Sequence, residues 1–256
     1  MLSLLSVWVS AALAADGAGS RVFIGVDETN AIGCVVDGKA VGGDACPLEG
    51  TGSGYAPLAG GPVRIPAGPI TLRAGAEDDM CGHQRVVVSF DRARTIDLGR
   101  AVTPIALPSA VYSKAIAEAT GVASPKITQL FKVDLEGDGK DEVIFAAESD
   151  ALETASNGDV STYAFVGVRR ITAAGKVEAV LLHKDQQTWP AAVVASGEMF
   201  PVHRYAKVLG LTDIDGDKKV ELMVQDGFYE GATTTLVRIV EGGVGFEVIG
   251  TTGCGN

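Results

Sequence analysis

The sequence predicts a mainly β protein with two four-stranded, blade-like antiparallel sheets in a propeller-like or sandwich-like arrangement. A β-rich N-terminal segment and one short helix complete the expected fold. The prediction rests on an acidic nine-residue loop that occurs twice and on strand-length apolar runs around each copy. Glycine, at 33 of 256 residues, punctuates these runs. A chain of this length can bury a sizeable core in one or two domains.

The acidic loop reads DLEGDGKDE at residues 134–142 and DIDGDKKVE at residues 213–221. Both copies have carboxylates at loop positions one, three, five and nine, and glycine at position four. Carboxylate oxygens on alternate residues of a tight loop can converge on one point, where a divalent cation offsets their mutual repulsion. Calcium fits this pattern best, because it accepts roughly six to eight oxygen ligands in flexible geometry.

The residues after each loop exclude an EF-hand or a dockerin. An EF-hand needs a bidentate glutamate at position twelve, where this chain has Phe145 and Val224. Short apolar runs rich in strand formers enter and leave both loops. Each loop is therefore expected to join two strands.

This strand–loop–strand unit resembles the FG-GAP and VCBS-type repeats of integrin-like β-propellers over about residues 125–256. The resemblance implies two calcium sites, each formed by four side chains and the carbonyl at position seven. The implied ligands are Asp134, Glu136, Asp138, Glu142 and the Lys140 carbonyl, then Asp213, Asp215, Asp217, Glu221 and the Lys219 carbonyl. The first loop fits better, because the second has Lys218 at position six, where a positive φ would cost about 1 kcal/mol. The alternative is a metal-free Asp-Gly turn that holds water.

The two repeats are expected within residues 122–256, at about residues 125–185 and 203–256. Each divides into four expected strands. They are residues 127–133, 142–147, 162–171 and 177–183, then 205–211, 221–224, 233–240 and 246–251. Two blades cannot close a propeller ring. They must pair face to face, use the N-terminal segment as a third layer, or associate with other copies. We favour a compact mixed-β domain made of two such sheets.

The N-terminal segment, residues 15–108, is expected to be β-rich and to contain disulfides. Its candidate strands are residues 22–26, 33–36, 63–65, 70–73 and 85–90, with a long loop dense in glycine and proline between residues 42 and 68. Residues 109–121 are predicted to form a linking helix, which Ser109 can cap and Gly121 ends.

Residues 1–14 are predicted to be a signal peptide. The apolar run from Leu2 to Leu13 ends in a small-residue cleavage site, Ala12-Leu13-Ala14, and is too short to span a bilayer. The alternative is a buried apolar strand. We therefore expect a secreted or periplasmic protein, or one at the cell surface, without membrane insertion.

The chain contains four cysteines, Cys34, Cys46, Cys81 and Cys254. An even number in an oxidising compartment indicates two disulfides, for which three pairings exist. We favour Cys46 with Cys81 and Cys34 with Cys254, because a bridge to Cys254 must reach back to the N-terminal region. A zinc site is the alternative, although no C-x-x-C spacing occurs.

The composition argues for a binding or structural module. A formal charge of −11 opposes nucleic-acid binding, which requires a basic surface. The three histidines, His83, His183 and His203, are isolated in the sequence, and no nucleophile elbow occurs. We expect a non-enzymatic calcium-binding protein with a protein or glycan partner. Tyr229 and Trp189 are possible contacts, unless Trp189 fills the core. The alternatives are a calcium-dependent extracellular hydrolase of glycans or phosphoesters, or metal-free loops in a disulfide-held domain.

Overall fold

The structure is a computed structural model that describes residues 21–24, 31–46, 51–52, 54–56, 70–71, 86–89, 100–172, 174–240 and 245–255. The predicted signal peptide, the expected strand at residues 63–65, His83 and Cys81 lie outside these ranges. Within the described residues no helix is both long and apolar enough to cross a membrane.

The described strands form three main antiparallel sheets and a short two-stranded one. The N-terminal sheet contains β1 (Arg21–Ile24), β2 (Ala31–Val36), β3 (Lys39–Gly42), β5 (Gly54–Ala56) and β7 (Val86–Ser89). The short sheet pairs β4 (Thr51–Gly52) with β6 (Ile70–Thr71). The first-repeat sheet contains β8 (Thr103–Pro104), β9 (Ile127–Val133), β10 (Glu142–Glu148), β11 (Glu153–Thr154), β12 (Val160–Ile171) and β13 (Val177–Trp189). The second-repeat sheet contains β14 (Tyr205–Thr212), β15 (Glu221–Phe228), β16 (Gly231–Ile239) and β17 (Phe246–Gly255).

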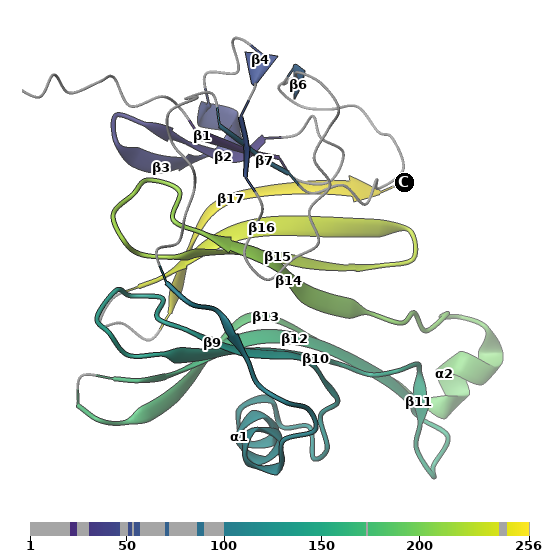
Figure 1. The fold of residues 1–256 in the computed structure, drawn as a ribbon. Helices are drawn as coiled ribbons and strands as arrows, with labels where there is room; N and C mark the ends of the chain where they lie inside the picture. The colour runs from purple at the N-terminus through teal and green to yellow at the C-terminus, as the bar shows by residue number, and fades with distance from the viewer. Residues whose placement is uncertain are drawn as a thin grey trace, which may run out of the picture.

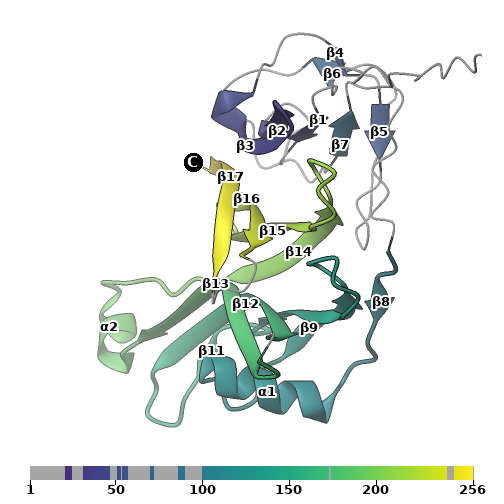
Figure 2. The same cartoon turned by 90° about the vertical axis from the view of Figure 1, so that its left-hand side faces the viewer.

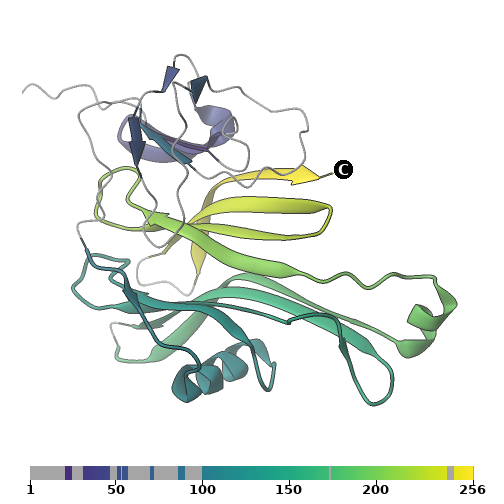
Figure 3. The same cartoon turned by 45° about the vertical axis from the view of Figure 1, so that its right-hand side comes forward.

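The expected mainly β fold is confirmed, and its sheets stack as layers without closing into a ring (Figures 1 and 3). In each repeat the four expected strands lie beside one another as an antiparallel meander, β9-β10-β12-β13 and β14-β15-β16-β17. The hydrophobic runs therefore located the strands of both repeats.

Three elements of the first-repeat region were not predicted. The short strands β8 and β11 extend the first-repeat sheet, and a second helix, α2 (Ala191–Ser196), follows β13. In addition, β13 continues past His183 to Trp189 through a polar stretch that stays paired with β12. Polar side chains on this half-exposed strand give no apolar alternation, so the sequence pattern could not reveal it.

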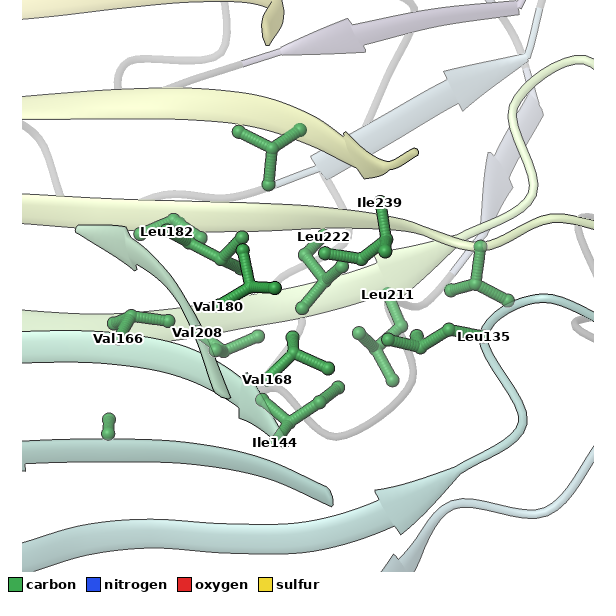
Figure 4. Close-up of a cluster of buried hydrophobic side chains, with 14 of the residues drawn as sticks. Leu135, Ile144, Val166, Val168, Val180, Leu182, Val208, Leu211, Leu222 and Ile239 are labelled. Carbon is green, nitrogen blue, oxygen red and sulfur yellow. The ribbon is translucent and has the colours of Figure 1, made fainter. Parts of the chain in front are cut away.

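The main core lies between the two repeat sheets (Figure 4). It combines first-repeat residues such as Ile144 and Val168 with second-repeat residues such as Leu211 and Leu222. The N-terminal sheet covers the other face of the second-repeat sheet, where Ile32 packs into a separate buried cluster. Face-to-face pairing and a third N-terminal layer, which we had considered as alternatives, therefore occur together.

The linking helix α1 (Ala110–Thr120) covers the outer face of the first-repeat sheet through Ile116 and Phe145 (Figure 1). Gly121 ends the helix in the left-handed conformation, as predicted. Ser109 stands at the N-cap position, but its side chain makes no capping hydrogen bond.

The disulfide joins Cys34 to Cys46, so our preferred pairing, Cys34 with Cys254 and Cys46 with Cys81, is wrong. The β2–β3 hairpin turns the chain back on itself, which brings the two Cα atoms to 5.8 Å although they are 12 residues apart. Of the three pairings, only the one that joins Cys81 to Cys254 remains compatible with a second bridge.

A side chain of the first-repeat sheet satisfies the backbone of β14, which is an edge strand of the second-repeat sheet. The Val208 amide donates to Oε1 of Gln129 at 2.7 Å, and Nε2 of Gln129 donates to the Val208 carbonyl at 3.0 Å. Unpaired edge groups are costly when buried and invite pairing with other chains. Gln129 therefore joins the two repeat sheets by pairing with the backbone of Val208 on the open edge of β14.

Replacing Gln129 with leucine should lower the free energy of unfolding by about 2 kcal/mol, because two backbone groups of the buried Val208 lose their partner. Urea denaturation would measure the loss. The matched control is Gln186→Leu on exposed β13 surface, which should change stability by less than about 0.5 kcal/mol. Equal effects of the two substitutions would contradict this role of Gln129.

Candidate metal centre

The two acidic loops lie next to each other at one end of the stacked sheets (Figures 1 and 2). The first joins β9 to β10 and the second joins β14 to β15, as the flanking runs predicted. The Val220 amide of the second loop donates a hydrogen bond to the Leu135 carbonyl of the first at 2.8 Å. Two loops that are 79 residues apart in sequence thus touch directly.

Four hydrogen bonds recur at equivalent positions of the two loops. In each loop the carboxylate of the aspartate at position one accepts two of these bonds, from the backbone amides of positions four and six. The aspartate at position five accepts the third, from the amide of position seven. The glutamate at position nine accepts the fourth, from the amide of position two. The first-loop distances are 2.7, 3.0, 2.9 and 2.7 Å, and the second-loop distances are 2.7, 3.1, 2.7 and 2.8 Å. The resemblance between the loops therefore extends from sequence to local geometry.

Positions four and six turn each loop through positive φ. Gly137 and Gly216 at position four have φ of 74° and 77°. At position six Gly139 has φ of 82°, and Lys218 has φ of 70°. Position six therefore does adopt the positive φ under which a side chain is penalised, and Lys218 carries a strain of about 1 kcal/mol.

The carboxylates of the second loop converge. Ligand atoms of Asp213, Asp215 and Asp217 lie within 4.8 Å of one another, and these residues form the one such group of acidic, histidine or cysteine side chains among the described residues. The Glu221 side chain is buried beside them. The loop spacing predicted four converging side chains, and three of them form this group, which does not include Glu221.

The carboxylates of the first loop form no such group among the described residues, and two of them pair with cations. Oε1 of Glu136 lies 3.1 Å from Nη1 of Arg170. Oδ2 of Asp138 lies 2.8 Å from the Lys140 ammonium, whose hydrogen bond lowers the pKa of Asp138.

An arginine on the third strand of each repeat approaches the loop, and sequence reasoning missed both. Arg238 stands opposite Glu221 in the strand register, and the register of Val143 with Arg169 places Arg170 opposite Glu142. The signal was present: each arginine interrupts an otherwise apolar run, VRRI at 168–171 and VRI at 237–239.

Arg238 forms a fork of contacts inside the second loop. Its Nη2 lies 2.7 Å from Oδ2 of Asp215, and its Nε donates to Oε1 of Glu221 at 2.6 Å. Its Nη1 lies 3.8 Å from Oδ2 of Asp217. The loop therefore contains one guanidinium among four carboxyl groups.

Burial and charge set the pKa values of these carboxyl groups in the metal-free protein. Burial raises the pKa of Glu142 to about 7 and that of Glu221 to about 7, although Arg238 opposes the second shift. Burial also raises the pKa of Asp213. For Asp215, burial acts in the same direction but is outweighed by the hydrogen bond and charge of Arg238, which lower its pKa.

The two candidate contact residues have different surroundings. Tyr229, in the turn between β15 and β16, is 78 % exposed. Trp189 at the end of β13 is 6 % exposed, so the structure supports its alternative role as a core residue and not a role as a surface contact. Nδ1 of His183 lies 3.5 Å from Oδ1 of Asp226.

Searches against protein-family models, curated proteins and solved structures found no match for the chain. The resemblance to FG-GAP and VCBS-type repeats therefore rests on the two loops and on the repeated meander around them.

Proposed function

We propose that this is a secreted or periplasmic, non-enzymatic calcium-binding protein built from two FG-GAP/VCBS-like repeats. Its role is that of a structural module or a binding module for a protein or glycan, with Tyr229 as a contact residue. The observation that carries the proposal is the convergence of Asp213, Asp215 and Asp217 beside the buried Glu221. The Cys34–Cys46 disulfide supports an oxidising compartment.

The charge of the second loop favours a divalent cation. Four carboxyl groups face one guanidinium, that of Arg238, so up to three negative charges remain for a metal to offset. All candidate ligands, including the Lys219 carbonyl, are oxygens. Calcium tolerates an irregular set of oxygens, whereas magnesium demands a near-octahedral one. The loop therefore suits calcium better than magnesium.

The geometry reverses our preference between the two loops. The sequence favoured the first, because glycine occupies its sixth position. In the structure both loops pair with cations, Arg170 and Lys140 in the first and Arg238 in the second. Among the described residues, however, only the second loop has three aspartates whose ligand atoms lie within 4.8 Å of one another. We propose the second loop as the principal calcium site and the first as a weaker one.

Calorimetric titration of calcium into the chelator-treated protein tests the proposal. Asp213→Ala should abolish the tighter binding event, whereas the matched change Asp134→Ala in the first loop should weaken that event without abolishing it. Saturating calcium at about 100 times Kd should add about 2.7 kcal/mol to the free energy of unfolding. Absence of binding at millimolar calcium, with a melting temperature unaffected by chelator, would refute the proposal.

A further inference from the structure

The contact between the two loops is a built feature with several components. Leu135 and Val220, which form the backbone hydrogen bond between the loops, are both buried. Water therefore does not compete for this bond, and its loss would leave two buried backbone groups without a partner. This bond is close to a candidate ligand of each loop. Val220 precedes Glu221 in the sequence, and the Leu135 amide donates to Oε2 of Glu142 at 2.7 Å.

Arg100 forms a second bridge between the loops. Its Nη1 donates to the Asp134 carbonyl of the first loop, and its Nη2 donates to the Lys218 carbonyl of the second at 2.5 Å. The Arg100 side chain is only 15 % exposed. One guanidinium thus bridges two loop backbones, and its donors have a fixed planar geometry that the ammonium of lysine lacks.

The loops also fit closely against each other. A Cβ atom added to Gly137 in the first loop would lie 2.9 Å from the Lys218 carbonyl oxygen and 3.2 Å from Nη2 of Arg100. Lys218 stands between Asp217 and Lys219, both candidate ligands of the second loop. A displacement of the first loop would therefore press directly on the backbone that carries those ligands.

We propose that the two loops form one coupled unit, in which Arg100 and the first loop position the second loop for calcium. Arg100 is a positioning residue for the second loop, because its contact there is with the Lys218 carbonyl and not with a candidate ligand; in the first loop it also lies 4.0 Å from Oδ1 of Asp134. This inference rests on the proposed calcium site, but the coupling itself exists without metal. Coupling between sites typically changes an affinity by about 5-fold to 150-fold.

Two glycines of the first loop provide a matched test. Gly137 and Gly139 have φ of 74° and 82°, so alanine is strained by a similar amount at either position. Only Gly137 faces the second loop, since a Cβ on Gly139 would meet nothing within 4 Å. Gly137→Ala should weaken calcium binding at the second loop by about 5-fold or more, and Gly139→Ala by less than about 2-fold. Equal effects of the two changes would overturn the coupling.

A metal-free readout separates this inference from the calcium proposal. In chelator, amide hydrogen exchange at Lys218, Lys219 and Val220 should accelerate in Gly137→Ala but not in Gly139→Ala. Arg100→Leu, which leaves both turns intact, should accelerate the same amides and serves if Gly137→Ala fails to fold. If the wild type binds no calcium but these amides respond, the calcium proposal fails and the coupling stands. If the amides do not respond, the coupling is wrong whatever the calcium affinity.

Discussion

Replacing Arg238 with leucine should lower the free energy of unfolding of the calcium-free protein by about 3 kcal/mol. The guanidinium contacts Glu221, which is fully buried, and Asp215, whose side chain is 5 % exposed. Removing one partner of a buried ion pair leaves a charge without compensation, and this loss exceeds the net stabilisation from the intact pair. Part of the loss is relieved because the pKa of Glu221 is already raised, so that the carboxyl group can bind a proton.

Urea denaturation in chelator, and again with calcium, would measure this effect. Calcium should restore much of the lost stability, because the metal replaces the missing positive charge. Arg169→Leu is the matched control: this arginine lies on the corresponding strand of the first repeat and stacks over the Tyr112 ring at 5.8 Å. The control should lose less than about 1 kcal/mol. A loss below that value for Arg238→Leu would contradict the role of Arg238 as an internal cation.

The second large effect concerns pH. In chelator, Glu142 should make the protein about 3 kcal/mol less stable above pH 7 than below pH 4.5. Burial raises the pKa of its carboxyl group from 4.5 to about 7 in the folded state, and each pKa unit corresponds to about 1.4 kcal/mol. Between these values the folded protein holds a proton that the unfolded chain has released. Stability from this group is therefore present at low pH and is lost as the pH rises from 4.5 through 7.

The difference between the wild type and Glu142→Gln isolates this contribution from those of other carboxylates. The glutamine variant, whose amide oxygen can still accept from Leu135, should be the more stable protein at pH 7.5 in chelator and should lack this pH dependence. Glu153→Gln, at an exposed position, is the control. Identical pH profiles of unfolding for the wild type and Glu142→Gln would show that the pKa of Glu142 is not raised in the folded state.

Much of the fold could be predicted because its strands bury regular apolar faces. Ile127–Val133 was predicted with its observed bounds, and Gly121 ended α1 as expected. The polar half of β13 could not be predicted, since pairing with β12 and not apolar periodicity holds it. The helix α2 has only six residues and none of them is buried, so no apolar stripe marks it. The disulfide was predicted wrongly because the β2–β3 hairpin, which places Cys46 near Cys34, was not recognised.

The candidate site was only partly accessible from the sequence. Loop spacing identified the carboxylates. Their arginine partners come from distant strands: Arg170 is 34 residues from Glu136, and Arg238 is 23 residues from Asp215. Strand register brings these groups together, and a single sequence without pairing information does not reveal that register.

The calcium site can be tested most directly by a crystal structure of the protein grown in calcium, with an anomalous difference map. We expect a peak in the second loop at about 2.3–2.6 Å from carboxylate oxygens of Asp213, Asp215 and Asp217. A map with no peak there, and with Arg238 still in contact with Asp215 and Glu221, would show that the second loop is not a calcium site.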